Sequence, residues 1–379
     1  MHIETLRWKS SGGWNRSAKA SQSPVDLILY FGPTALLEQP DSPWRELQAA
    51  HPGAVCAGCS TAGEIFQNTV SDGGLCAVLV RFSATHVRGA ARTVSAPGES
   101  RAVGTALARE LAKPGLRHVL VLSDGLGING TALTASLRET LPDGVYVTGG
   151  LAGDGAAFQR TVTGLGGTLR PGQVVAIGFY GDKLRTLWGS AGGWIPFGPK
   201  LRITRAKDNV LYTLDGQPAL ALYKQHLGKR AAGLPATGLL FPLQLLTPEH
   251  PENGIVRTIL GVDEATQSLT FAGDMPVGQH ARLMKASSKV LIAGAEAAAG
   301  QIFAPADGEH LALMVSCVGR KLVLGKRTVN EVKAALRCLP PDTRALGFYS
   351  YGEICPSEFV SSCDLHNQTM TITLFNEEP

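Results

Sequence analysis

Short apolar runs of strand length recur along the whole chain, and their spacing limits the fold more than any other sequence feature. The runs at 119–122 and 311–315 consist entirely of apolar residues. Runs of this length that are bounded by turn residues are typical of buried strands. All of them fall far short of the roughly 20 apolar residues that a membrane-spanning helix requires. The sequence therefore predicts many strands and no bilayer span.

Helical periodicity separates several of these runs. Val103, Leu107 and Leu111 recur at helical spacing, and Pro114 and Gly115 follow them as stop signals. We expect helices over residues 100–111, 131–140, 218–226, 287–301 and 328–338. Strand–helix–strand units mixed with adjacent strands predict an α/β chain of mixed α+β character, with two regions of mixed, largely antiparallel sheets covered by helices.

Two pairs of predicted strands are separated by almost no connecting residues. Residues 75–83 are followed at once by 85–94, and residues 173–181 by 184–194. Connections this short favour strands that turn back on each other. We therefore expect each pair to lie side by side, the first as an antiparallel hairpin.

Length and composition predict a compact protein with two domains. The 379 residues exceed one ordinary core, and 44% hydrophobic with 17% charged residues is typical of a folded chain. We expect a flexible N-terminal arm over 1–23, a first domain over 24–216 and a second over 217–379. One large elaborated unit is the alternative.

Charge and cysteine content argue against several classes of protein. The 35 basic and 31 acidic residues are spread along the chain, so nucleic acid is not an expected partner. The N-terminus has no apolar segment followed by a cleavage site, which favours a cytoplasmic location. Seven cysteines, an odd number in a reducing compartment, are expected to be thiols or ligands rather than a disulfide framework.

The GCSTAGEIF motif at 58–66 combines small residues with polar side chains. Its glycines allow close approach of a backbone, and Cys59, Ser60 and Thr61 lie in a turn whose amides could bind an anion. Glu64 adds a carboxylate. The alternative is a tight strand-to-helix corner with a Ser or Thr cap and Glu64 as its capping-box partner. A nucleophilic Cys59 is a third interpretation, although no motif supplies its base.

Two aspartates stand in glycine-rich segments that carry no nucleotide-binding fingerprint. Asp154, in GGLAGDG, either recognises an ammonium or hydroxyl group from a flexible pocket wall or belongs to a long turn. Asp124 follows a predicted strand, where open sheets commonly present ligand-binding groups. Its alternative role is a turn residue, with Asn129 as a helix cap.

The segment 347–375 concentrates ionisable and sulfur-bearing side chains between two predicted strands. If those strands pair, Glu353 faces His366 or Asn367 at the rim of a pocket. The Cys-Pro dipeptide is compatible with haem ligation through Cys355, and His366 could serve as an axial ligand. A polar run that satisfies backbone groups at a strand entrance is the alternative. Together with Cys355 and His366, Cys363 would give only three zinc ligands at irregular spacing, so a zinc site is disfavoured. If Tyr351 is buried, its hydroxyl group needs a hydrogen-bond partner.

Four motifs together resemble the FIST-domain family, with an N-terminal FIST region followed by a FIST_C region. They are GCSTAGEI at 58–65, GGLAGDG with F-x-R-T at 149–161, WIPFGP to ALALY at 194–223, and YGEI with LHNQTMT at 351–371. The resemblance implies a bacterial signal-input module, proposed to bind a small ligand and often encoded near histidine kinases, cyclic-dinucleotide enzymes or chemotaxis components. It also implies a possible haem, because a subset of the family binds haem and reports nitric oxide to a kinase. No enzymatic chemistry is established for the family in general.

Three functional hypotheses follow from the sequence and the resemblance. The first is a non-enzymatic sensory protein that binds an amino acid or related metabolite between the two regions and relays to a separate signalling partner. The second is a haem-binding nitric-oxide sensor that regulates a histidine kinase. The third is an uncharacterised hydrolase or transferase that uses Cys59 or the acidic groups, although the sequence offers no nucleophile, base and oxyanion set in a known order.

Overall fold

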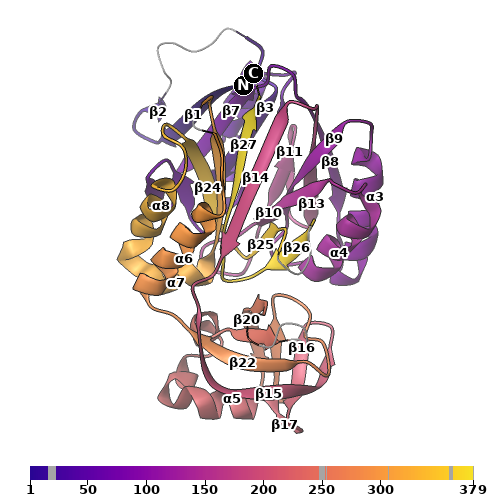
Figure 1. Ribbon diagram of the computed structural model, residues 1–379, viewed down its shortest axis with the longest axis vertical. Helices are drawn as coiled ribbons and strands as arrows, with labels where there is room; N and C mark the ends of the chain where they lie inside the picture. Colours follow the sequence, from indigo (N-terminus) through magenta and orange to yellow (C-terminus); the bar gives the residue numbers. More distant parts are fainter. Residues whose placement is uncertain (16–22, 247–251, 253, 306, 358–361, 379) are drawn as a thin grey trace.

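The chain forms a main lobe and a smaller lobe below it (Figure 1). The computed structural model describes residues 1–379 except 16–22, 247–251, 253, 306, 358–361 and 379. The small lobe begins with β15 (Ile195–Lys207) and ends with β22 (His280–Lys285), and these two strands pair with Ile195 opposite Lys285. The small lobe is therefore inserted into the main lobe through two adjacent crossings of the chain.

Within the described residues the main lobe contains three sheets, and each is built around one parallel pair of strands whose connection includes helices. The pairs are β3 (Leu27–Gly32) with β4 (Val55–Ser60), β9 (Leu116–Ser123) with β10 (Tyr146–Leu151), and β23 (Leu311–Cys317) with β24 (Arg344–Ser350). Antiparallel strands complete each sheet, so the predicted α/β fold with mixed and antiparallel sheets is confirmed.

The remaining strands extend these pairs on both sides. Sheet 1 has the order β12-β11-β4-β3-β7-β1-β2 and adds β1 (His2–Lys9), β2 (Gly13–Trp14), β7 (Leu75–Arg81), β11 (Thr163–Leu165) and β12 (Thr168–Arg170). Sheet 2 has the order β26-β25-β10-β9-β13-β8 and adds β8 (His86–Thr93), β13 (Gln173–Tyr180), β25 (Gly352–Cys355) and β26 (Asp364–His366). Sheet 3 has the order β14-β27-β23-β24-β5-β6 and adds β5 (Glu64–Phe66), β6 (Thr69–Ser71), β14 (Leu184–Ala191) and β27 (Met370–Glu377).

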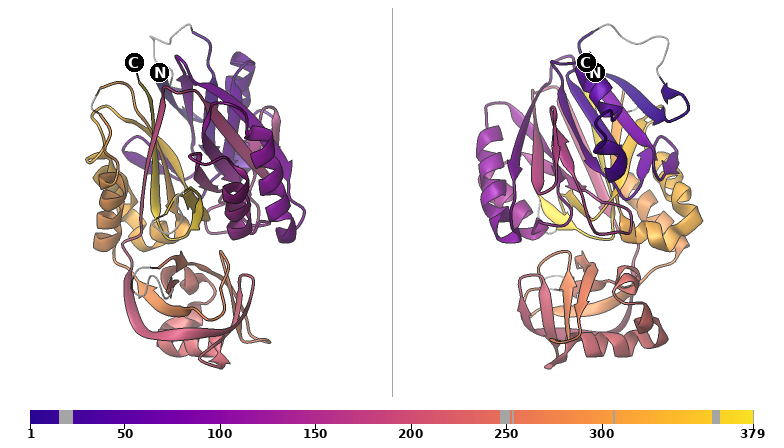
Figure 2. Two further views of the ribbon diagram at one scale, coloured as in Figure 1. Left: turned by 45° about the vertical axis from the view of Figure 1, so that its right-hand side comes forward. Right: turned by 180° about the vertical axis from the view of Figure 1, so that it is seen from behind.

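Helices cover the outer faces of the three sheets (Figure 2). They are α1 (Thr34–Leu37) and α2 (Trp44–Ala50) by sheet 1, α3 (Ser100–Leu111) and α4 (Gly130–Thr140) by sheet 2, and α6 (Ser288–Gly300), α7 (Val318–Leu324) and α8 (Thr328–Leu336) by sheet 3. The predicted helices at 100–111, 131–140, 287–301 and 328–338 are confirmed. The sequence analysis missed α1, α2 and α7, which are short. Within the described residues no helix is long and apolar enough to cross a bilayer.

The inner faces of the three sheets share one apolar core. Phe31 of sheet 1, Leu122 of sheet 2 and Phe348 of sheet 3 are all fully buried in it. The Phe31 and Phe348 rings stack with their centroids 4.8 Å apart. Because the central strands of this core, such as β3 and β23, are buried on both faces, the sequence shows continuous apolar runs there rather than alternation.

The small lobe has an antiparallel sheet and an apolar core of its own. Besides β15 and β22 it contains β16 (Val210–Leu214), β17 (Gln217–Pro218), β18 (Leu243–Leu246), β19 (Val256–Arg257), β20 (Ile259–Asp263), β21 (Ser268–Phe271), α5 (Ala219–Leu227) and the 3₁₀ turn η3 (Ala236–Leu240). Leu211, Tyr223 and Phe271 are buried at its centre. The predicted helix at 218–226 is confirmed as α5. Residues 24–216 and 217–379 are the ranges that were expected to form two domains. Both ranges contribute strands to sheets 2 and 3 and to the small lobe.

The predicted pairing of consecutive strands is wrong in both places. β7 lies in sheet 1 and β8 in sheet 2, while β13 lies in sheet 2 and β14 in sheet 3. Each short connection carries the chain from one sheet to the next around the shared core. Short loops fix only that consecutive strands start close together, and burial of both apolar faces decides which sheet each strand joins.

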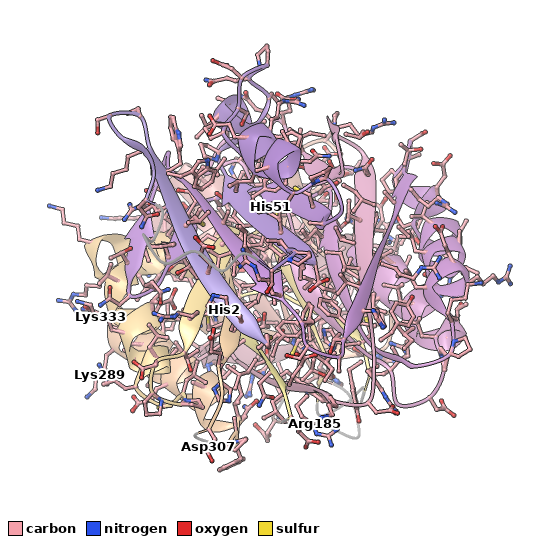
Figure 3. The ribbon with its side chains drawn as sticks, turned by 90° about the horizontal axis from the view of Figure 1, so that it is seen from above. His2, His51, Arg185, Lys289, Asp307 and Lys333 are labelled. Carbon is pink, nitrogen blue, oxygen red and sulfur yellow. The ribbon has the colours of Figure 1, made fainter. Side chains whose placement is uncertain are left out.

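The predicted flexible arm is also wrong for the first residues of the chain. β1 pairs with β7 from His2 to Trp8, and Leu6 is buried. The two termini lie close together at the end seen from above in Figure 3, where the Met1 ammonium group pairs with Glu377 at 3.2 Å. His2, labelled there, lies 2.8 Å from the Glu309 carboxylate. Residues 16–22 of the predicted arm lie outside the described residues.

Candidate ligand-binding site

Several predicted site residues lie where strands of the parallel pairs end. Ser60 ends β4 and Thr61 follows it, Asp124 directly follows β9, and Tyr351 directly follows β24. Asp154 comes shortly after the end of β10. Loops at the carboxyl ends of parallel strands gather at one edge of a sheet, where such folds commonly bind ligands. Here three sheets contribute such ends, and they meet: the Gly153 amide donates to the Ser60 carbonyl oxygen at 3.0 Å, and the Tyr351 hydroxyl contacts Asp154.

A cavity of about 470 Å³ brings together three of the predicted residues, Thr61, Glu64 and Asp154. The start of α1, the turn after β6 and the loop that follows Asp154 complete its wall. We call it the Glu64 cavity. It combines charged side chains with small apolar ones such as Pro33 and Ala157.

Glu64 is only 2% exposed, and both of its carboxylate oxygens accept hydrogen bonds. Oε1 accepts from Thr61 Oγ1 at 2.7 Å, and Oε2 accepts from the Gly74 amide at 3.2 Å and from Ser71 Oγ at 3.3 Å. Burial outweighs these bonds and raises the pKa of Glu64 from 4.5 to about 7. The carboxyl group therefore changes charge near neutral pH while it borders the cavity.

The GCSTAGEIF turn connects two strands, so the expected strand-to-helix corner is wrong. After β4 the chain turns and enters β5 at Glu64. The Ala62 amide donates to the Tyr349 carbonyl oxygen at 2.8 Å, and the Gly63 amide donates to Thr61 Oγ1 at 3.2 Å. These two amides are therefore not free to bind an anion. In place of a capping box, Thr61 Oγ1 donates directly to Glu64 Oε1.

Asp154 shapes one wall of the cavity. Its Oδ1 accepts from the Phe158 amide at 2.8 Å and from the Tyr351 hydroxyl, and its Oδ2 accepts from the amides of Gln159 and Arg160 at 2.8 and 2.7 Å. The Tyr351 ring stacks on Phe158 at 4.3 Å between centroids. Although burial acts to raise it, the pKa of Asp154 lies below its usual value because of these hydrogen bonds. Asp154 is ionised, and it positions the loop that carries Arg160.

Two ion pairs that the sequence analysis missed flank the Glu64 cavity. Arg160 lies 2.8 Å from Glu38, with exposed side-chain fractions of 55% and 34%. Lys321 Nζ pairs with Asp72 and donates to the Ala62 carbonyl oxygen at 2.6 Å. Arg160 stands in the F-x-R-T motif and could have been singled out. The others have no local signal, because they reach the cavity from separate segments.

Asp124 has the structural role that was its alternative. It is 4% exposed, and it accepts from the Gly127 amide at 2.7 Å and from Thr161 Oγ1 at 2.9 Å. Asn129 caps α4, because its side-chain oxygen accepts from the Ala132 amide at 2.9 Å. Asp124 therefore holds the turn that follows β9.

Cys59 and Ser60 lie in the core, and neither lines the Glu64 cavity. Cys59 is fully buried, and burial raises the pKa of its thiol well above the usual value. Ser60 Oγ accepts from the Val162 amide at 3.0 Å. A buried thiol with a raised pKa is a poor nucleophile, so this geometry disfavours the Cys59 chemistry considered above.

The C-terminal candidates are separate from the Glu64 cavity. Glu353 does lie opposite His366, but through the short strands β25 and β26. The two longer strands that were expected to pair, β24 and β27, are separated by β23. Glu353 is fully buried, and its oxygens accept from Ser350 Oγ at 2.6 Å and from Thr369 Oγ1 at 2.9 Å. Burial raises the pKa of Glu353 from 4.5 to about 7. The residue ties β25 to the start of β27.

We expect Glu353→Gln to change how stability depends on pH. A raised carboxyl pKa means that the folded state binds the proton more tightly, so the contribution of Glu353 to stability falls as pH rises from 4.5 to about 7. The wild type should lose about 3 kcal/mol relative to the variant over this range. Urea unfolding at several pH values measures the difference, with exposed Glu296→Gln as the matched control. A constant difference across the range would contradict the prediction.

Cys355 and His366 do not fit a haem-ligand role. Cys355 is fully buried and its thiol pKa is raised by burial. His366 borders a separate cavity of about 390 Å³, but its Nε2 lies at 3.0 Å from the Cys355 carbonyl oxygen. Asn367 is 1% exposed and accepts from the Thr258 amide at 3.4 Å. For a metal ion held by side chains alone, which is a separate matter from haem, the described residues contain no group of three or more His, Cys, Asp or Glu side chains that could hold it.

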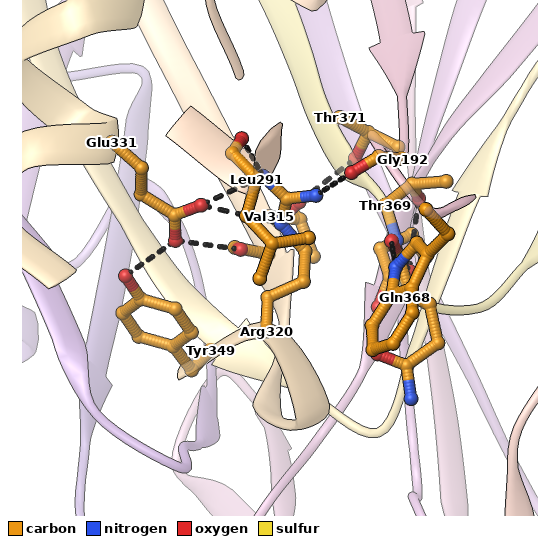
Figure 4. A network of polar contacts seen from close by, with 12 residues as sticks. Gly192, Leu291, Val315, Arg320, Glu331, Tyr349, Gln368, Thr369 and Thr371 are labelled. Carbon is orange, nitrogen blue, oxygen red and sulfur yellow. Dashed lines mark hydrogen bonds and ion pairs between the residues drawn. The ribbon is translucent and has the colours of Figure 1, made fainter. Parts of the chain in front are cut away.

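Figure 4 shows a network of polar contacts around a buried ion pair between Arg320 and Glu331. Arg320 and Glu331 are both fully buried and lie 2.8 Å apart. Glu331 accepts from the Tyr349 hydroxyl at 2.7 Å, and Arg320 donates to the Leu291 carbonyl oxygen at 2.8 Å. Tyr349 in turn accepts from the amide of Ala62. The pair thus connects α6, α7, α8 and β24 to the turn that carries Glu64.

Comparison with known proteins gives a family match over most of the chain. The FIST N domain matches residues 26–217 and the FIST C domain matches residues 219–356. A search of curated proteins found no match. A crystal structure of chorismatase covers 99% of this chain and 98% of its own, with 10% identity and a TM-score of 0.35, which is too weak to inform function. Since the two domain matches follow each other over nearly all of the chain, it belongs to the FIST family.

Proposed function

We propose that this protein is a non-enzymatic sensor that binds a small zwitterionic metabolite, such as an amino acid, in the Glu64 cavity. FIST domains are associated with sensory signal transduction and ligand binding. The observation that carries the proposal is the presence of both charge signs around one cavity. Arg160 is the cation that lines the cavity, and Lys321 lies beside it, paired with Asp72. The carboxylates that line it are Glu38, Glu64, Asp72 and Asp154.

A zwitterion can pair both of its charged ends in the Glu64 cavity, and the free energy lost by breaking the existing ion pair is small. The Arg160–Glu38 pair is largely exposed, and such pairs contribute only about 0–1 kcal/mol. Its guanidinium group can therefore exchange Glu38 for a ligand carboxylate, with the bidentate geometry that arginine favours. The Asp72 side chain is 75% exposed beyond its pair with Lys321, so it can accept a hydrogen bond from the ligand ammonium group, and Glu64 borders the same space.

Ligand binding in the Glu64 cavity can change the arrangement of surface segments, because the wall of the cavity is made of segments that are separate in the chain. Arg160 stands on the loop that Asp154 holds, and Glu64 stands on the β5–β6 hairpin that pairs with β24. A ligand that bridges them favours one arrangement of these segments over others. The proposed partner is a separate histidine kinase, cyclic-dinucleotide enzyme or chemotaxis protein in the cytoplasm.

A calorimetric titration with individual amino acids tests the proposal. The ligand is expected to stabilise the fold by about 2.7 kcal/mol at a concentration of 100 times its Kd. Glu64→Gln and Arg160→Gln should each weaken binding about tenfold or more, because each removes one charge partner. Arg92→Gln, which breaks an exposed ion pair with Glu110 elsewhere, is the matched control. Binding that both cavity variants leave unchanged would refute the assignment, as would no binding by any amino acid or related metabolite.

A further inference from the structure

A second cavity lies between the two lobes, apart from the Glu64 cavity. It has a volume of about 590 Å³ and is lined from above by the turn after β9 and the start of α4. From below it is lined by β20, β21 and residues 272–274 of the small lobe. Asn129 Nδ2 crosses between the lobes and donates to Asp274 Oδ1 at 3.0 Å. We call this cavity the inter-lobe cleft.

The cleft exposes apolar side chains from both lobes. Leu126 of the main lobe is 39% exposed and Leu260 of the small lobe is 40% exposed. Leu151 and Phe271 line the same space but are buried. Sites for small organic molecules usually combine such apolar walls with a few polar groups, and they occur preferentially between domains. The cleft therefore offers room and contact area for an apolar body.

The carboxylate in the cleft that has no partner is Asp208. Within the described residues its exposed side chain has no hydrogen bond or ion pair, whereas Asp274 accepts from Asn129 through Oδ1 and is also attracted by the buried Arg257. The one cation that lines the cleft, Arg101, already pairs with Glu139. A ligand that enters the cleft therefore meets Asp208 without a cation paired to it, and Asp274 beside it.

We propose that the inter-lobe cleft is a second ligand site that takes an organic cation with a small apolar body. The ammonium group would lie between Asp208 and Asp274, and the apolar body between Leu126 and Leu260. Such a ligand contacts both lobes at once, so it favours the arrangement in which the small lobe lies close to the main lobe. The site does not depend on the ligand proposed for the Glu64 cavity.

Tyr351 connects the two cavities. It lines the inter-lobe cleft, and its hydroxyl group contacts Asp154, which borders the Glu64 cavity. A ligand in the cleft that moves the Tyr351 ring therefore acts on the loop that carries Arg160. A ligand in the inter-lobe cleft can therefore change how strongly the Glu64 cavity binds its own ligand.

Titration with phenethylamine and with 3-phenylpropionate tests the proposal, because the two compounds share an apolar body and carry opposite charges. Phenethylamine should bind at one site per chain, and 3-phenylpropionate about tenfold more weakly or less. Asp208→Asn and Leu260→Ser should each weaken phenethylamine binding about fivefold or more. Asp307→Asn, which alters a carboxylate labelled in Figure 3 far from the cleft, should leave binding unchanged.

Three outcomes would overturn the second site. These are no binding of phenethylamine at millimolar concentration, equal binding of the anion, or binding that Glu64→Gln abolishes and Asp208→Asn leaves intact. The last result would place the cation in the Glu64 cavity instead. A failure of the amino acid titration alone would remove the proposed function and leave the cleft proposal standing.

Discussion

Replacing Arg320 by methionine is expected to lower the free energy of unfolding by about 3–5 kcal/mol, because it leaves the Glu331 carboxylate buried without its cation. Both side chains are fully buried, and Arg320 also bonds to the carbonyl oxygens of Gly192 and Leu291. The variant loses these bonds as well as the ion pair. Guanidinium chloride unfolding followed by circular dichroism measures the change.

The matched control for this prediction is an exposed ion pair. Arg101 and Glu139 are more than half exposed, so Arg101→Met should cost at most about 1 kcal/mol. Equal effects of the two substitutions would contradict the assigned role of the buried pair. A variant of Arg320 that fails to fold would agree with it, provided that Arg101→Met folds.

Gly149→Ala is the second substitution with a large expected effect. Gly149 lies in β10 with φ of +140°, and a Cβ atom there would stand 1.9 Å from the Val121 carbonyl oxygen on the neighbouring strand β9. Real Cβ atoms do not approach a backbone oxygen this closely, so β9 and β10 would have to separate. We expect a loss of about 3 kcal/mol or more, measured by chemical unfolding.

Gly53→Ala is the control, because no atom lies within 4 Å of the position of its Cβ and its φ is not positive. It should change stability by no more than about 0.5 kcal/mol. A small effect of Gly149→Ala would show that β10 can shift away from β9. Gly149 is a buried residue of β10, as the strand predicted over 145–150 implies, and the loop that carries Asp154 begins only after Leu151.

Local patterns in the sequence were sufficient for most of the longer helices and the central strands. The helix predicted at 100–111 matches α3 residue for residue, because its apolar spacing and the following Pro and Gly are local signals. The continuous apolar runs were identified as strands for the same reason. β1 was missed because its residues alternate between charged and apolar types, and its place beside β7 depends on a strand about 70 residues away.

The candidate site was predictable only in part. Thr61, Glu64 and Asp154 were singled out from two motifs, and the structure brings them to one cavity. Asp124 and Glu353 stand in equally suggestive motifs, but they hold a turn and a strand entrance. A polar residue that follows a strand has the same sequence signature whether it faces a cavity or the backbone.

The sequence by itself determined most of the longer elements, the mixed fold class and the family, because these depend on periodicity and on motifs that are contiguous in the chain. The tertiary structure alone decided which sheet each strand joins, that residues 195–285 form a separate lobe, and that Glu38, Asp72, Arg160 and Lys321 surround Glu64. The physical reason is the shared core. Three sheets bury their inner faces against one another, and this long-range packing sets which distant loops meet at the cavity.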